Sequence, residues 1–147
     1  MHERRAFGLA RSGDRDGRND GPVRSVARDA RDHDPRDPDG TGLPSHPDHA
    51  IAQRLLPNGA GGMIAVEVSG GVEGGKAFCD ALELAWVATS LGGTHTLVGH
   101  AASTTHRRYP REARRAAGIA DGLVRVSVGL EDADDLLEDM GRALEKI

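Results

Sequence analysis

The chain has 147 residues, with 23 acidic and 19 basic side chains and a net charge of −4. This mild acidic excess gives no electrostatic footprint for nucleic acid or an anionic membrane, and no apolar run is long enough to span a bilayer. The chain does not open on a secretory signal pattern, and its single cysteine, Cys79, excludes an internal disulfide framework. We expect a cytoplasmic protein with one folded domain.

Residues 1–41 differ in composition from the rest of the chain. They hold nine arginines, nine acidic residues and no lysine, with few large apolar side chains. Such a segment cannot bury enough surface to offset the entropy lost on ordering. We predict a disordered charged leader over 1–41, either a solvated segment or the product of a shifted reading frame or a truncated gene. A charged interaction tail is the functional alternative.

Residues 42–147 carry the periodic patterns of a folded domain. The spacing of apolar residues over 46–57 predicts a short helix that is closed by Pro57. After a glycine-rich turn, alternating apolar residues over 62–71 predict a half-buried strand. The side chains expected on its buried face are Ile64, Val66 and Val68.

The middle of the domain is expected to hold one helix and two short extended pieces. Apolar residues at helical spacing predict a helix over 72–86, which two glycines weaken near its start. The extended pieces follow over 86–89 and 96–98, separated by a double-glycine turn. Cys79 lies on the predicted helix and is expected to be a small buried residue, not a nucleophile.

Three elements complete the domain. A brief helix is expected over 110–118, with Pro110 in its first turn and Gly118 as its stop. The segment 122–129 is the second clear strand. The last helix, over 133–147, has the strongest amphipathic pattern, and aspartates crowd its N-terminus, where the helix dipole favours negative charge. This order of elements predicts an α+β fold, a small and mostly antiparallel sheet with helices on one face.

One residue interrupts the apolar strand over 122–129. Val124 and Val126 point to one face of the strand, whereas Arg125 and Ser127 point to the other. Because an unpaired guanidinium is costly to bury, Arg125 needs water or an anion beside it. From the pattern alone, the anion is either a carboxylate of the same chain or a bound ligand.

Three segments of the domain occur in one order with regular spacing. They are GLPSHPDHAIAQRLLPNGAGGMIAVEV, TSLGGTHTLVGHAASTTH and GIADGLVRVSVGLEDADDLLEDMGRAL. Together they resemble the C-terminal domain of the Cys/Met-metabolism (trans-sulfuration) family of pyridoxal-phosphate enzymes, which includes cystathionine gamma-synthase, cystathionine gamma-lyase, methionine gamma-lyase and O-acylhomoserine sulfhydrylases. The resemblance covers residues 42–147. It implies the C-terminal domain of a fold-type I enzyme, with pyridoxal phosphate as cofactor and an amino acid as substrate.

The resemblance implies substrate-binding roles for three residues. In the family, the arginine of the L-x-R-x-S-V-G strand binds the substrate α-carboxylate, and Arg125 stands at that position; a guanidinium fork matches a carboxylate with two parallel hydrogen bonds. The serine of the S-L-G-G turn lies beside the cofactor-bearing lysine, which implies that Ser90 helps to form the substrate site; the alternative is a turn serine that bonds its own backbone.

Cystathionine-processing relatives carry a glutamate just before this turn. Thr89 at that position implies a substrate without a distal ammonium group, such as an O-acylhomoserine or methionine, whereas the S-L-G-G turn itself is more similar to the cystathionine branch, so the resemblance leaves the branch open.

The groups that would hold the cofactor are missing from the pattern. The chemistry of pyridoxal phosphate needs a Schiff-base lysine, and neither Lys76 nor Lys146 stands in the family's Ser-x-Thr-Lys setting. We expect no catalytic or cofactor-binding residue in this chain. We expect a fragment, inactive alone, that recognises the substrate carboxylate for γ-replacement or γ-elimination on O-acylhomoserine, cystathionine or methionine. The alternatives are a non-catalytic binding or interaction module and an unstable pseudogene product.

The expected partners and ligands follow from the same observations. No nucleic acid, membrane or metal is expected to bind. The histidines His95, His100 and His106 fit no helix face and have no acidic or thiol ligand between them, and His46 and His49 are dismissed on the same grounds. The resemblance leaves two assemblies open, a homo-oligomer and association with an intact family member.

Overall fold

The computed structural model describes residues 23–25, 42, 44, 46–59 and 61–147. Its strands are β1 (Val23–Ser25), β2 (Met63–Val68), β3 (Trp86–Val87), β4 (Leu97–His100) and β5 (Leu123–Ser127). Its helices are α1 (His49–Leu55), α2 (Gly71–Asp80), α3 (Arg111–Ala116) and α4 (Ala133–Leu144). Among the described residues, no helix combines the length and apolar character needed to cross a bilayer.

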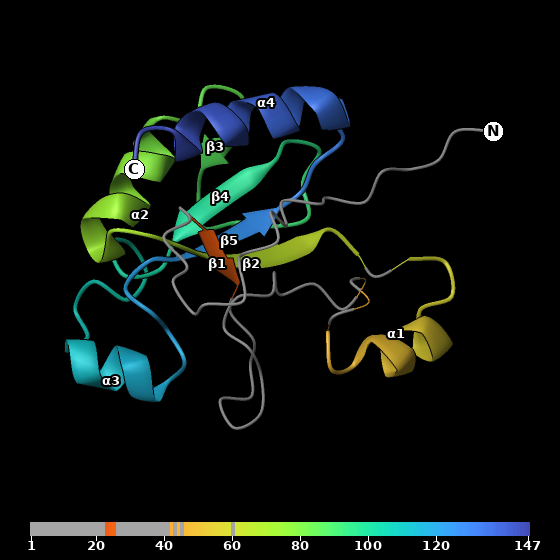
Figure 1. Ribbon diagram of the computed structural model, residues 1–147, viewed down its shortest axis with the longest axis horizontal. Coiled ribbons are helices and arrows are strands. Elements are labelled where there is room, and N and C mark those ends of the chain that lie inside the picture. Colours follow the sequence, from red (N-terminus) through yellow and green to blue (C-terminus); the bar gives the residue numbers. More distant parts are fainter. Residues whose placement is uncertain (1–22, 26–41, 43, 45, 60) are drawn as a thin grey trace, which may run out of the picture.

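The strands form one five-stranded sheet in the order β1-β2-β5-β4-β3 (Figure 1). Every neighbouring pair is antiparallel except β3 and β4, which run parallel. The two strands with the clearest alternation in the sequence, β2 and β5, pair with each other. β5 therefore lies at the centre of the sheet and is hydrogen-bonded to a neighbour on both edges. A side chain on such a strand is held more precisely than one on a loop.

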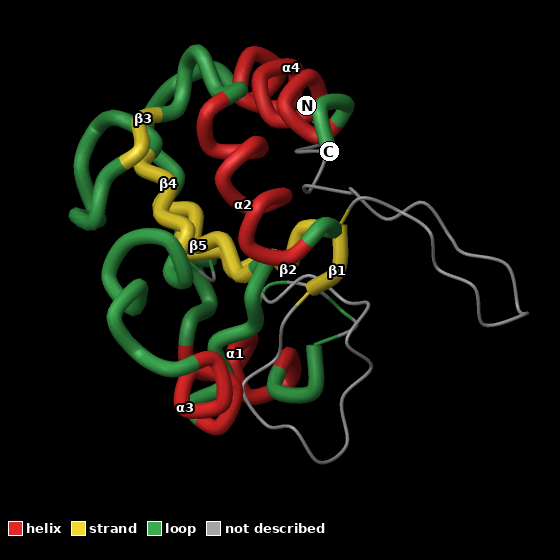
Figure 2. The backbone as a smooth tube through the Cα atoms, turned by 90° about the vertical axis from the view of Figure 1, so that its left-hand side faces the viewer, coloured by secondary structure: helices red, strands yellow, loops and turns green. Residues whose placement is uncertain are grey.

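Helices α2 and α4 cover one face of this sheet, whereas α1 and α3 lie away from that face (Figure 2). The predicted α+β fold, a mostly antiparallel sheet with helices on one face, is confirmed. The core between helices and sheet is apolar, and its largest contributors are Val68, Phe78, Val98, Val124, Val126, Met140 and Leu144. Cys79 lies in this core, as predicted, and burial, aided by the charge of Asp80, raises the pKa of its thiol to about 11.

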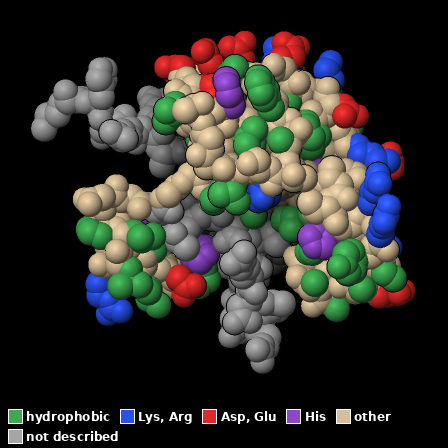
Figure 3. Space-filling model, turned by 180° about the vertical axis from the view of Figure 1, so that it is seen from behind, with side chains coloured by type: hydrophobic (Ala, Val, Ile, Leu, Met, Phe, Trp, Pro, Cys, Tyr) green, Lys and Arg blue, Asp and Glu red, His purple; other side chains and the backbone are tan. Residues whose placement is uncertain are grey.

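The amphipathic pattern of α4 is confirmed. Leu136, Met140 and Ala143 are buried, and Asp132 caps the helix by accepting a hydrogen bond from the backbone N–H of Asp134 at 2.9 Å. The opposite face of the helix is acidic, and acidic side chains gather along the top of Figure 3, over α4. The helix thus presents an apolar stripe to the sheet and negative charge to solvent.

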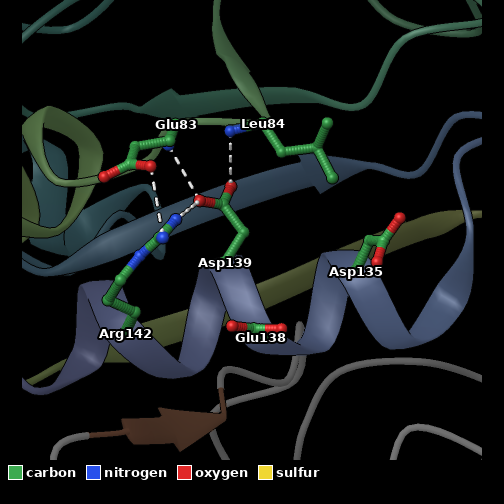
Figure 4. Close-up of a pocket in the computed structure, with 6 residues that line it drawn as sticks. All are labelled: Glu83, Leu84, Asp135, Glu138, Asp139 and Arg142. Carbon is green, nitrogen blue, oxygen red and sulfur yellow. Dashed lines mark hydrogen bonds and ion pairs between the residues drawn. The ribbon is translucent and has the colours of Figure 1, made fainter.

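Helix α2 is shorter than the predicted helix over 72–86. The chain leaves the helix after Asp80, and the next backbone N–H groups point at a side chain of α4. The carboxylate of Asp139 accepts hydrogen bonds from the N–H groups of Glu83, Leu84 and Ala85 at 2.8, 3.1 and 3.0 Å (Figure 4). A buried anion that collects three donors outweighs the local preference for another helical turn.

One strand of the sheet comes from the segment predicted to be disordered. Val23–Ser25 forms β1, which pairs antiparallel with β2 at the edge of the sheet. The prediction over 1–41 did not include this strand, which the exposed edge of β2 stabilises by offering unpaired backbone N–H and C=O groups. The prediction for the other residues of 1–41 lies outside the described part of the chain.

Candidate functional site

Arg125 lies at the middle of β5, opposite Ala65 of β2 and Gly99 of β4. Its neighbours in the strand, Val124 and Val126, are buried beneath α2 and α4, so the alternation of side chains sends Arg125 to the other face of the sheet. The small residues on the flanking strands leave room for the guanidinium. A Cβ on Gly99 would come within 3.9 Å of its Nη2 atom.

The guanidinium of Arg125 is hydrogen-bonded to the turn that follows β3. Nη2 donates to the backbone carbonyls of Thr89 at 3.0 Å and Ser90 at 2.6 Å. The structure therefore brings together the three residues singled out in the sequence as a substrate site. It does so through the backbone of Thr89 and Ser90, and both of these residues are exposed.

No carboxylate in the described part of the chain lies within ion-pair distance of Arg125. Within that part, its Nε atom is buried without a hydrogen-bond partner, and its hydrogen bonds run from Nη2 alone. Among the described residues, the positive charge thus faces carbonyl dipoles and no carboxylate. Within the same part of the chain Nη1 has no hydrogen-bond partner, so its donors are available to an anionic acceptor.

Arg114 shows the opposite arrangement on α3. Its Nη2 atom donates to Oδ1 of Asp121 at 2.8 Å, and Arg111 and Arg115 approach the other oxygen of the same carboxylate. Burial alone would raise the pKa of Asp121, but the hydrogen bonds from Arg114 and Arg111 hold it below its ordinary value. This cluster is an internal ion pair that links α3 to the segment before β5.

The chain around the turn exposes apolar surface. Trp86 of β3 stacks on the ring of His95, with centroids 4.5 Å apart and planes 9° from parallel. Trp86, Val87 and Leu91 are more than half exposed, at 58%, 51% and 59%. These side chains form an exposed apolar rim on the edge strand β3 and on the turn that Arg125 contacts. Trp86 lies opposite Leu97 and shares the sheet face of Arg125, whereas Val87 lies opposite Val98 and points to the helix-covered face.

A carboxylate fixes the far side of this loop. Glu131 accepts hydrogen bonds from the backbone N–H of Thr96 at 2.6 Å and from its Oγ1 at 2.8 Å. Burial would raise the pKa of Glu131, and these bonds hold it below its ordinary value. The loop between β3 and β4 is thus tied down at the Thr96 end by a negative charge and at the turn by a positive one.

The histidines considered as metal ligands lie in separate environments. His95 stacks on Trp86, and His106 contacts Thr105 through Nδ1 at 2.8 Å. His100 is buried, with Nδ1 bonded to Ser103 at 2.8 Å and Nε2 to the carbonyl of Asp121 at 2.8 Å. The part of the chain that is described holds no group of three or more His, Cys, Asp or Glu side chains arranged for a metal ion.

The two lysines do not fit the role of a pyridoxal-phosphate anchor beside Arg125. Lys76 lies on α2, with its Nζ atom 2.9 Å from Glu73, and Lys146 follows α4. Both helices cover the face of the sheet opposite to Arg125. The single tyrosine, Tyr109, is exposed and rests against the ring of His106. The chain therefore does not present the lysine side of a cofactor site next to its arginine.

One member of the site was missed in the sequence. Ser127 is buried, and its Oγ atom accepts a hydrogen bond from the backbone N–H of Gly92 at 2.9 Å. The alternation of the strand placed Ser127 on the same face as Arg125, which was a usable signal. Its partner lies 35 residues earlier in the chain, so the contact itself was not visible in the sequence.

Comparison with known proteins gives consistent results. Residues 40–145 match the family model described as Cys/Met metabolism PLP-dependent enzyme. Over 106 residues the chain is 50% identical to an L-methionine gamma-lyase of Fusobacterium nucleatum subsp. polymorphum. The aligned residues are 72% of this chain and 27% of that enzyme. The chain is 47% identical to an O-succinylhomoserine sulfhydrylase of Pseudomonas aeruginosa, with 70% of this chain and 25% of that enzyme covered.

The fold agrees with the sequence match. A crystal structure of cystathionine gamma synthase from Xanthomonas oryzae pv. oryzae in complex with cystathionine superimposes with a TM-score of 0.66 at 44% identity, covering 75% of this chain and 28% of that one. The chain spans about a quarter of the length of the curated relatives it matches. Because the family model covers well over half of the sequence, this chain belongs to the Cys/Met metabolism family of pyridoxal-phosphate-dependent enzymes.

Proposed function

We propose that this chain supplies the wall that binds the substrate α-carboxylate in a pyridoxal-phosphate enzyme of sulfur amino-acid metabolism. The observation that carries the proposal is the setting of Arg125 on a central strand. Its guanidinium lies on the sheet face away from α2 and α4 and has no carboxylate partner among the described residues. Membership of a family of amino-acid enzymes supports an amino acid as the ligand.

The chemistry of this wall is recognition and orientation. The hydrogen bonds that Nη2 donates to the carbonyls of Thr89 and Ser90 hold the guanidinium in place. Its Nη1 group can donate charge-assisted hydrogen bonds to a carboxylate. Binding the α-carboxylate of an amino acid fixes where its α-carbon and side chain lie relative to the strand. The cofactor, which supplies the electron sink of this family, must be anchored by a lysine outside this chain.

The substrate class is proposed from Thr89. This residue is exposed and neutral, so it offers no full negative charge to a distal ammonium group. We infer γ-elimination or γ-replacement on methionine or an O-acylhomoserine rather than on cystathionine. Methionine gamma-lyases and an O-succinylhomoserine sulfhydrylase are among the relatives, and the cystathionine gamma synthase of 44% identity represents the alternative branch.

The assembly is part of the same proposal. The exposed side chains of Trp86, Val87 and Leu91 border the turn beside Arg125. Apolar groups clustered in this way mark surfaces that another protein surface covers. We propose that the rim packs against a family member that carries the Schiff-base lysine, in the cytoplasm. Mixing the chain with such an enzyme should give a complex on gel filtration, and Trp86→Ser should weaken it.

A titration tests the carboxylate site directly. The ¹⁵N-labelled chain is titrated with L-methionine and with L-methioninamide, and the Arg125 Nε–H signal and the amides of the turn are followed by NMR. We expect millimolar affinity for the acid, about −4 kcal/mol of binding free energy, and roughly tenfold weaker binding of the amide.

Two variants serve as a matched pair in this titration. Arg125→Gln should abolish the response, whereas Arg54→Gln, which removes an exposed arginine of α1, should leave it unchanged. Equal binding of acid and amide, or equal behaviour of the two variants, would refute the proposed function.

A further inference from the structure

We infer that Ser127 is a positioning residue of the carboxylate site, because it holds the turn to which the guanidinium of Arg125 is bonded. The inference rests on the proposed function and goes beyond it. It assigns to a buried hydroxyl on β5 the task of fixing residues 89–92, and through them the direction of the arginine fork.

Ser127 is only 3% exposed, and its Oγ atom accepts the N–H of Gly92 at 2.9 Å. Gly92 has φ +72°, a left-handed conformation that is strained for residues with a side chain. Glycine adopts it without this strain while its N–H donates to Ser127. Ser127 and Arg125 are two residues apart on one face of β5. Two side chains on one face of β5 therefore hydrogen-bond to both ends of the turn. Arg125 bonds to its first two residues, 89 and 90, and Ser127 to its last, Gly92.

The turn has few other attachments. The last ladder bond of β3 runs from Ala88 N–H to the Val98 carbonyl, and the next backbone bond in the loop is from Leu130 N–H to the Thr94 carbonyl. Between these points, within the described residues, the hydrogen bonds of the turn are the two from Arg125 and the one to Ser127. Leu91 is 59% exposed, so packing adds little.

The coupling to the ligand follows from shared donors. The Nη2 atom of Arg125 bonds the carbonyls of Thr89 and Ser90, so a shift of the turn turns the guanidinium with it. Loss of the Ser127 hydroxyl would release Gly92 and leave Arg125 as the only side chain, among the described residues, that is hydrogen-bonded to the turn. The fork would then sample several orientations, and a two-pronged hydrogen bond to a carboxylate would be formed less often.

Two observables without ligand test the positional part. In Ser127→Ala we expect the Gly92 amide to exchange with solvent at least tenfold faster and the Arg125 Nε–H signal to move or broaden. Ser103→Ala is the matched control, since it removes another serine hydroxyl, which bonds to His100 and not to the turn. It should leave both signals unchanged. Unchanged signals in Ser127→Ala would overturn the inference.

The ligand titration tests the functional part. We expect Ser127→Ala to weaken L-methionine binding roughly fivefold, the effect of one net hydrogen bond. Ser127→Thr and Ser127→Val form a second pair of equal size, of which only the first keeps the hydroxyl; threonine should restore both affinity and Gly92 protection, and valine should not. This pair decides the matter if alanine at this position unfolds the chain.

The two possible failures are distinguishable. A wild-type chain that binds acid and amide alike refutes the proposed function, while the Gly92 and Arg125 signals still report on the tether. Normal wild-type binding together with wild-type affinity in Ser127→Ala and Ser127→Val refutes the positioning role alone.

Discussion

Arg114 and Arg125 belong to the same small domain, but their guanidinium groups have opposite surroundings. Arg114 is buried and bonded to the carboxylate of Asp121, which two further arginines also approach. Arg125 is bonded to two backbone carbonyls and to no carboxylate among the described residues. The same residue type thus has its charge neutralised by a carboxylate in one place and, among the described residues, meets only backbone carbonyls in the other.

The difference has a physical basis in what each arginine's neighbours can supply. Asp121 comes just before β5 and lies close in sequence to α3, so its carboxylate reaches Arg114 within a short loop. Its carbonyl also accepts from the buried ring of His100, which ties the cluster to β4. Arg125 is flanked instead by Ala65 and Gly99, which carry no charge. Removing the charge of Asp121 and removing that of Arg125 should therefore have very different consequences.

The largest effect is expected at the neutralised pair. Asp121→Asn leaves the buried guanidinium of Arg114 without its counter-charge, and we expect a loss of about 3–5 kcal/mol in the free energy of unfolding. Urea unfolding followed by circular dichroism measures it. Glu112→Gln, an exposed change on the same helix, is the control and should shift stability by less than about 0.5 kcal/mol. A similarly small shift for Asp121→Asn would show that the cluster does not hold α3.

Acid should weaken the hydrogen bonds of the structural carboxylates. Burial would raise the pKa of Asp121, Glu131 and Asp139, but hydrogen bonds from guanidinium and N–H groups keep each below its ordinary value. Because the folded chain takes up these protons at lower pH than the unfolded chain does, their stabilisation is complete above the unfolded pKa, near 4, and is lost below it.

The measurement is the urea midpoint at pH 7, 5, 4 and 3. We expect little change in the contribution of these groups between pH 7 and 5 and a clear fall from pH 4 to 3. The Asp121→Asn variant should show a shallower fall over that interval. Midpoints at pH 3 that match those at pH 5 would contradict the role given to these three carboxylates.

A smaller effect on stability is expected at the open arginine. Arg125→Gln removes two hydrogen bonds to carbonyls of an exposed turn, which water can replace, so we expect a loss of about 1 kcal/mol or less. Binding of L-methionine should be lost in the same variant. A cost as large as that of Asp121→Asn would make Arg125 a structural residue and remove the contrast on which the proposed site depends.

The smallest effect is expected from the cofactor itself. Neither Lys76 nor Lys146 lies on the face of Arg125, so pyridoxal phosphate added to the chain alone should give no aldimine absorbance and no adduct after borohydride reduction. Mass spectrometry of the reduced chain, compared with a Lys76→Arg variant, makes the check. A specific adduct on Lys76 would show that this chain carries more of the active site than its arginine side.

Much of the domain followed from patterns in the sequence. Helix α4 and strands β2 and β5 have strong periodicity, and their buried faces agree with it, as Leu136, Val68 and Val126 show. The end of α2 was wrong by about a turn and a half, because the partner that stops it, Asp139, lies on α4 more than fifty residues away. Strand β1 was missed because a segment of 3 residues is too short to show an alternating pattern. It is recognisable as a strand only through its pairing with the edge of β2.

The amino-acid sequence by itself determined most of the helices and strands between residues 42 and 147, which residues of a strand share a face, and that one cation interrupts an apolar strand, since these depend on the local period of the chain. Only the tertiary structure decided which guanidinium is neutralised and which stays open. That choice depends on which distant groups are brought within hydrogen-bond reach: Asp121 for Arg114, and the carbonyls and N–H of the turn for Arg125 and Ser127. Hydrogen bonds act over about 3 Å, so their pairing is fixed only when the sheet has assembled.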